Sequence, residues 1–97
     1  MAQPVWNTNA GSLGTYPSGL LLVSQLSASP VLPASSIQYT LLSGSLPSGV
    51  SLSEDGLITG TPVLVVADST SAFTVRATDN LNNIRDRTFS IRIFQGL

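Results

Sequence analysis

Side chains that carry out acid–base or nucleophilic catalysis are scarce in this sequence. The 97 residues include no histidine, no cysteine and no lysine, and the only cationic side chains are four arginines. A base that titrates near neutral pH, a thiol nucleophile and the usual zinc ligands are therefore missing. The serines have no partner to activate them, so the sequence predicts a protein that is not an enzyme and needs no cofactor.

Two adjacent carboxylates, Glu54 and Asp55, are the nearest approach to a catalytic pair. Glycoside hydrolysis uses two carboxyl groups that flank the scissile bond. Here, however, the two acids precede Gly56, in a combination that is typical of a tight turn. We interpret them as solvent-exposed turn residues, and a hydrolytic activity lost in Glu54→Gln would contradict this interpretation.

Oxygen-bearing side chains gather again later in the chain. They are Asp79, Asn80, Asn82, Asn83 and Asp86. Calcium prefers such ligands, which makes Asp79, Asn80, Asn82 and Asp86 candidates for a calcium site. The spacing does not follow the EF-hand loop, and only two carboxylates supply charge beside two arginines. We therefore favour a plain Asn-rich turn over a calcium site.

All four arginines lie in the last quarter of the sequence, at positions 76, 85, 87 and 92. A surface that carried them together could dock a phosphate or an acidic sugar, with Arg85 and Arg87 as candidate ligands. The favoured interpretation is that outward arginines pair with Asp79 and Asp86 across neighbouring strands.

Two aromatic residues near the start are further candidates. The flat ring of Trp6 could stack on a sugar, although its place beside Val5 on a short first strand favours packing in the core. Tyr16 lies in a glycine-rich connection, residues 7–19, where we expect a loop at one end of the fold.

The composition restricts the partners. Charged residues make up 9% of the chain, the net charge is -1, and serine and threonine together are about a quarter. Without a basic surface, neither nucleic acid nor an anionic membrane is an expected partner. No apolar run reaches the roughly 18 residues that a spanning helix needs, so membrane insertion is not expected either. This balance is common in extracellular and virion β proteins.

Short alternating segments predict strands. Alternation is clear over residues 37–41, 73–77 and 89–93, whereas residues 20–28 are apolar on both faces and predict a buried strand. The turn at 79–83 predicts a final hairpin in which Val75 faces Phe89 and Phe73 faces Ile91. Residues 44–49 predict a chain reversal after Leu42.

Residues 50–52 and 57–59 predict a second, tight hairpin that needs a positive φ at Gly56. About seven short strands separated by turns indicate an all-β, immunoglobulin-like or cadherin-like sandwich, in one domain over residues 1–97. A small closed barrel is the alternative. The apolar run of residues 63–67 is expected to cover a sheet edge or to pack on a neighbouring domain.

Several motifs resemble the Ig-like He_PIG modules, which are related to dystroglycan-type cadherin-like domains. LPSGVSL at 46–52 is similar to their LPxGLxL, and GLITGTP at 56–62 is similar to GxIxGTP, although Val50 stands where leucine is usual. FTVRATD at 73–79 and FSIRI at 89–93 resemble their later strands. The resemblance implies the sandwich fold and no catalytic activity.

PVW at 4–6, GSLG at 11–14 and DRTF at 86–89 also resemble modules of tailed-phage structural proteins. We therefore predict a non-enzymatic structural or adhesion module of a virion protein (tail, baseplate or fibre), which serves as a spacer or a host-surface contact. The alternatives are a tandem repeat of a bacterial cell-surface adhesin and a carbohydrate-binding accessory domain of a larger enzyme. Expected partners are neighbouring domains of the same protein and cell-surface glycans, in the virion or outside the cell.

Overall fold

The backbone forms strands throughout the part of the chain that the computed structural model describes, residues 3–63 and 68–95. Nine strands and no helix lie within these ranges. They are β1 (Val5–Trp6), β2 (Gly11–Pro17), β3 (Leu22–Gln25), β4 (Ala28–Ser29), β5 (Ile37–Gly44), β6 (Val50–Leu52), β7 (Leu57–Gly60), β8 (Ser69–Asp79) and β9 (Ile84–Phe94). The predicted all-β architecture is confirmed, with nine strands where about seven were expected.

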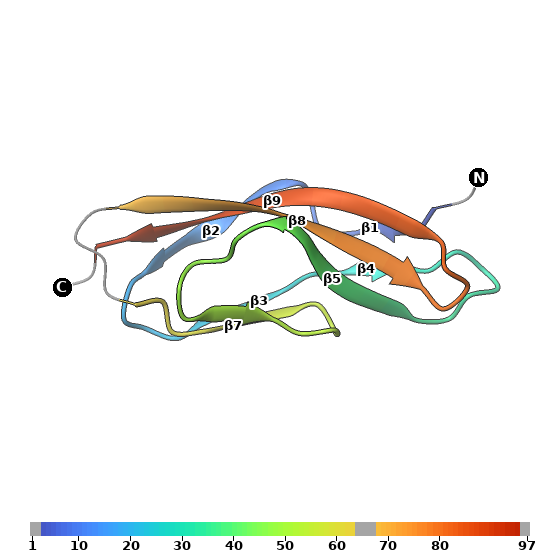
Figure 1. Cartoon of the computed structure of the whole chain (residues 1–97), viewed down its shortest axis with the longest axis horizontal. Helices are drawn as coiled ribbons and strands as arrows, with labels where there is room; N and C mark the ends of the chain where they lie inside the picture. Colours follow the sequence, from blue (N-terminus) through green and yellow to red (C-terminus); the bar gives the residue numbers. More distant parts are fainter. Residues whose placement is uncertain (1–2, 64–67, 96–97) are drawn as a thin grey trace.

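The strands form two facing layers. One is a four-stranded sheet in the order β2-β9-β8-β5, the other is a three-stranded sheet in the order β3-β7-β6, and β1 pairs with β4. Figure 1 shows the four-stranded sheet above β3 and β7, with the strands close to the long axis of the molecule. The extents of 49 × 18 × 18 Å describe a narrow β-sandwich, as the sequence predicted.

The core lies between the layers, where the alternating side chains of β8 and β9 point inward. The predicted inward positions of these two strands are all buried: Phe73, Val75, Ala77, Phe89, Ile91 and Ile93. The opposite layer contributes Leu22 and Ile58, and Trp6 of β1 and Tyr39 of β5 belong to the same cluster. Because a period of two fixes which face is buried, the sequence pattern was sufficient to identify this part of the core.

The register of the β8–β9 hairpin differs from the prediction by two residues. Phe73 faces Phe89, and Val75 faces Arg87. The turn is tighter than expected because its first residue closes it: the N–H of Asp79 donates to the carbonyl of Asn83 at 2.9 Å. A shift of two residues keeps every side chain on the same face, so the hydrophobic pattern cannot distinguish the two registers.

The glycine-rich connection at residues 7–19 is not a loop throughout, because it contains β2. This strand runs parallel to β9, with Gly11 beside Phe89 and Tyr16 beside Ile93. The register shifts between Ser12 and Thr15, next to Gly14 with φ of 127°. An irregular edge strand rich in glycine has no period-two pattern, which is why the sequence did not reveal it.

The predicted buried strand over residues 20–28 is shorter and buried on one face only. β3 begins at Leu22, which is buried, whereas Leu21 is 71% exposed and Val23 is 55% exposed. β3 lies at the edge of its sheet, with an outer face that no other layer covers. The expectation of burial on both faces was therefore wrong.

The second predicted hairpin is confirmed. β6 and β7 pair antiparallel, and Gly56 has φ of 85° in the turn between them. Glu54 and Asp55 are exposed turn residues, as interpreted from the sequence. The turn packs under β5, because the N–H of Tyr39 donates to the carbonyl of Glu54 at 2.9 Å.

The connection between β5 and β6 carries the chain from one layer to the other. β5 continues to Gly44, two residues beyond the predicted reversal, and a turn then links the carbonyl of Pro47 to the N–H of Val50 at 3.0 Å. Of the apolar run at 63–67, the described residues include only Val63, which is 54% exposed. The predicted role of that run lies outside the described residues.

Candidate functional site

The four arginines do not form one basic face. Because side chains alternate along a strand, Arg85 and Arg87 share the face of β9 that carries Phe89, whereas Arg92 points to the opposite face. Arg76 lies opposite Asp86 on that outer face. The predicted phosphate or acidic-sugar surface is thus divided between the two sides of the sheet.

Three of the arginines have partners. Arg76 forms a two-pronged ion pair with Asp86, with nitrogen–oxygen distances of 2.8 and 3.1 Å, which raises the pKa of Arg76. Arg92 pairs with Asp68 at 3.0 Å. Arg87 donates to the carbonyl of Thr8 at 2.8 Å and so holds the connection before β2. The cross-strand pairing with Asp86 is confirmed, and the pairing with Asp79 is not.

Asp79 instead organises the β8–β9 turn. It is 2% exposed, and its carboxylate accepts hydrogen bonds from the N–H groups of Leu81 and Asn83 at 2.9 Å and of Val31 at 3.3 Å. The side-chain amide of Asn83 also donates to it, at 2.9 Å. The carboxylate therefore joins the turn to the loop before β5.

Burial opposes the ionisation of Asp79, and it is the largest single influence on this group. The hydrogen bonds from Asn83, Leu81 and Val31 outweigh it together, and they lower the pKa of the Asp79 carboxyl below its usual value. The pKa of Asp68 is lowered as well, first by the N–H of Gln95 and then by Arg92.

The calcium candidates make separate contacts within the protein. Asn80 accepts hydrogen bonds from the N–H groups of Ser35 and Ser36, and Asp86 is paired with Arg76. Asn82 has φ of 66° and donates its N–H to the carbonyl of Asp79. Across residues 3–63 and 68–95, no three acidic or other metal-binding side chains are grouped. The Asn-rich turn is what the residues build.

Trp6 offers no free face to a sugar. Its side chain is 6% exposed and packs against Tyr39 and Phe89, with ring centroids 5.8 and 5.3 Å away. Tyr16 is also engaged, because its hydroxyl donates to the carbonyl of Leu13 at 3.0 Å. Both aromatic candidates serve the scaffold.

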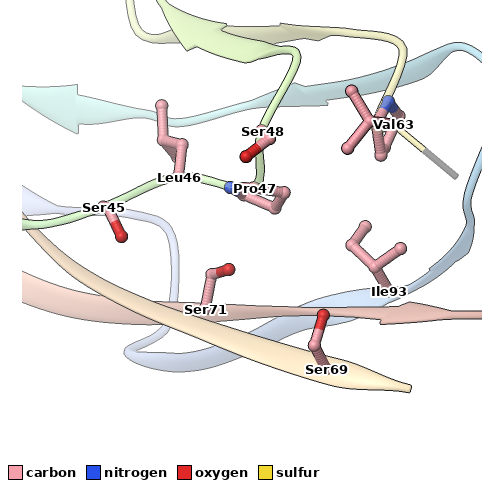
Figure 2. A pocket seen from close by; sticks show the side chains of 9 residues that line it. Ser45, Leu46, Pro47, Ser48, Val63, Ser69, Ser71 and Ile93 are labelled. Carbon is pink, nitrogen blue, oxygen red and sulfur yellow. The ribbon is translucent and has the colours of Figure 1, made fainter. Parts of the chain in front are cut away.

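A groove that the sequence did not predict opens between the β5–β6 connection and the start of β8. It has a volume of about 220 Å³ and is lined by Ser45, Leu46, Pro47, Ser48, Pro62, Val63, Ser69, Ser71 and Ile93. Figure 2 shows serines on both sides of it, two from the β5–β6 connection and two from the start of β8. The lining comes from four separate segments, so no single motif in the sequence marks it.

Main-chain hydrogen bonds fix the walls of this groove. The N–H of Val63 donates to the carbonyl of Ser48 at 3.0 Å, which ties the β5–β6 connection to the segment that follows β7. The N–H of Ser45 reaches the carbonyl of Ala72 at 3.4 Å, which ties the same connection to β8. A second hollow of about 420 Å³ also adjoins this connection and extends along β6.

Comparisons with known proteins agree with this fold. The family model He_PIG, described as "Putative Ig domain", matches residues 4–94. No curated protein is similar enough in sequence to count as a match. The described residues contain no helix that is long and apolar enough to cross a membrane.

Three solved structures with the same fold are much longer than this chain. A putative alpha-galactosidase of Bacteroides fragilis is 25% identical with a TM-score of 0.67, over 94% of this chain and 17% of that one. An endo-fucoidan hydrolase of glycoside hydrolase family 107 has a TM-score of 0.71 at 17% identity, over 97% of this chain and 14% of that one. The extracellular cadherin domains 1–4 of protocadherin gamma B7 give a TM-score of 0.66 at 19% identity, over 96% of this chain and 24% of that one.

Proposed function

This chain belongs to the He_PIG family of Ig domains, and from that premise we propose that it is a non-enzymatic structural and adhesion module of a longer extracellular protein. Its role is to space neighbouring domains or to contact a surface. The observation that carries this proposal is the shape: β1 lies toward one end of the 49 Å long axis and β9 ends toward the other (Figure 1). A module built in this way adds length between the domains that it joins.

The non-enzymatic part of the proposal is supported by the side chains available. The chain has no histidine, cysteine or lysine, and its adjacent carboxylates Glu54 and Asp55 are exposed turn residues. The virion assignment, to a tail, baseplate or fibre protein, depends on the resemblance of residues 4–6, 11–14 and 86–89 to phage modules. A repeat of a bacterial adhesin has the same physical requirements.

A carbohydrate-associated accessory module is the second candidate. The favouring observation is the 25% identity to the alpha-galactosidase, in which the matching part is 17% of the chain. A module of this kind accompanies a catalytic domain and contributes spacing or weak contact with the glycan.

One experiment tests both candidates. The labelled chain is incubated with bacterial envelopes and with purified glycans, and both retention and product release are measured. Saturable retention identifies a contact module, and no retention on any surface leaves the spacer role. Release of a sugar product that disappears in Glu54→Gln would overturn the non-enzymatic proposal.

Arg85→Ala is a suitable surface variant for this assay, because Arg85 is exposed and its side chain has no partner among the described residues. Trp6→Ala is unsuitable, because it removes a buried ring from the core and would alter the fold rather than a binding face.

A further inference from the structure

The serine side chains of the groove between the layers have unused hydrogen-bonding capacity. The hydroxyls of Ser45, Ser48, Ser69 and Ser71 have no hydrogen-bond partner in the described part of the chain. Figure 2 shows Ser45 and Ser48 on one side of the groove and Ser69 and Ser71 on the other, with the hydroxyls of Ser69 and Ser71 directed toward the space between. Each hydroxyl can donate one hydrogen bond and accept two.

The groove carries no charge of its own. None of its lining side chains is ionisable. Asp68 and Arg92, next to the groove, form an ion pair with a nitrogen–oxygen distance of 3.0 Å. The second carboxylate oxygen of Asp68 accepts a hydrogen bond from the N–H of Gln95. A charged ligand would therefore lose hydration here without gaining a counter-charge, so the groove favours a neutral ligand.

The floor of the groove is apolar and small. Ile93 is 1% exposed, Pro47 and Pro62 are buried, and Leu46 packs against the core. The volume of about 220 Å³ equals that of roughly seven water molecules, which is below the usual range of drug-sized pockets. A space of this size holds one small ring.

A ligand that fits must be neutral and compact, with polar groups around an apolar face. A single sugar residue has this form, because its hydroxyls lie at the ring edge and its C–H groups lie on the ring faces. We propose that the groove lined by Ser45, Ser48, Ser69 and Ser71 binds one neutral sugar residue, free or within a glycan. The proposal rests on the carbohydrate-associated candidate function and gives it a location.

The binding test uses the isotopically labelled chain and neutral hexoses. Galactose, glucose and mannose are titrated while the backbone N–H signals are followed by nuclear magnetic resonance. With hydroxyls and no aromatic platform, we expect a dissociation constant on the order of millimolar. The expected result is saturable shifts confined to residues 45–48, 62–63, 69–71 and 93, and weaker binding of glucuronate than of glucose.

Matched serine variants locate the site. Ser48→Ala and Ser71→Ala should each weaken binding about threefold to tenfold, because each removes one neutral hydrogen bond. Ser36→Ala is the control, since Ser36 is exposed in another loop and its hydroxyl has no partner among the described residues. Ser71→Val introduces a residue type that is well suited to a strand. Its side chain fills part of the groove and should abolish binding.

The outcomes separate this proposal from the broader one. Shifts that saturate and disappear in Ser71→Val support the groove. No shift with any hexose, or shifts elsewhere that Ser71→Val leaves unchanged, would overturn it. If envelopes or glycans retain the chain and Ser71→Val alike, the groove proposal fails while the contact function stands.

Discussion

The indole N–H of Trp6 donates a hydrogen bond to the carbonyl oxygen of Arg85 at 3.1 Å, across 79 positions of the chain. The bond joins the first strand to the last long strand and satisfies the polar atom of a buried ring. The same ring meets Phe89 edge-on. Trp6 therefore fastens the β1–β4 pair to the four-stranded sheet.

Two replacements of Trp6 should separate the contribution of its hydrogen bond from that of its ring packing. Trp6→Phe retains an aromatic ring but leaves the carbonyl of Arg85 without its donor, and we expect a loss of about 1–3 kcal/mol in the free energy of unfolding. Trp6→Ala should lose about 3–5 kcal/mol. Trp6 is the single tryptophan, so both variants lack tryptophan fluorescence, and urea unfolding should be followed by circular dichroism. Equal stabilities of Trp6→Phe and the parent would show that the hydrogen bond contributes nothing.

A side chain at Gly56 should destabilise the fold, both because of the positive φ and because of crowding by neighbouring atoms. A control at Gly11 separates these two causes. A Cβ at Gly56 would lie 2.9 Å from a ring carbon of Tyr39 and 3.0 Å from the carbonyl oxygen of Leu26. Gly11 also has positive φ, but a Cβ there would meet nothing within 4 Å. We expect Gly11→Ala to cost about 1 kcal/mol and Gly56→Ala about 2–4 kcal/mol. Chemical denaturation measures both, and equal losses would mean that crowding at Gly56 is unimportant.

The carboxylate of Asp79 should make the stability of the fold depend on pH in the acidic range. Its pKa is lower in the folded protein than in the unfolded chain, so ionised Asp79 stabilises the fold above about pH 4. This stabilisation is lost as the pH falls through the lowered pKa. Melting temperatures between pH 2 and 7 should therefore fall less steeply on acidification in Asp79→Asn, which starts from a lower value at pH 7.

Asp55→Asn is the control for this pH dependence, because Asp55 is an exposed turn residue. A parent-like melting temperature of Asp79→Asn at pH 7 would contradict the role assigned to its hydrogen bonds. Asp68, with its own lowered pKa, should leave part of the acid dependence in place.

Calcium should not stabilise the chain. The oxygens of Asp79 already accept N–H groups, and Asp86 is paired with Arg76. We expect the same melting temperature in millimolar calcium and in a chelator. A rise with calcium that disappears in Asp79→Asn would restore the calcium site.

Engineered disulfides should report the register of the β8–β9 hairpin. The hydroxyls of Thr74 and Thr88 lie 2.8 Å apart, on residues directly opposite each other. Paired cysteines at 74 and 88 should oxidise readily, because opposite residues fall within disulfide reach and diagonal residues do not. Cysteines at 74 and 90 form the control. The chain has no native cysteine, so mass spectrometry gives a direct answer, and faster oxidation of the control would favour the other register.

The sequence was sufficient for the parts of the fold that repeat with a period of two. Phe73, Val75, Phe89 and Ile91 alternate with polar residues, and burying one face of such a strand requires that alternation. Gly56 was predictable because a tight turn needs a positive φ. The register was not predictable, since it depends on how the side chain of Asp79 closes the turn.

The candidate site was less accessible to prediction than the fold. Arg85, Arg87 and Trp6 were selected for their side-chain chemistry, but Trp6 is buried in the core and Arg87 is bonded to a main-chain carbonyl, which leaves Arg85 exposed. The groove is formed by serines from separate segments, among them Ser48 and Ser71. Serine is common in this chain, so no spacing distinguished those that line the groove from those that face solvent elsewhere.

The parallel pairing of β2 with β9 determines how the module carries mechanical load. β2 belongs to the first part of the chain and β9 to the last, yet the two run side by side in the same direction. A force that pulls the two ends of the chain apart therefore slides β2 against β9. The hydrogen bonds between the strands are then loaded in shear and together, whereas in an unzipping geometry they would break one after another. A domain under tension in a tail, fibre or surface protein would resist stretching through this pair of strands.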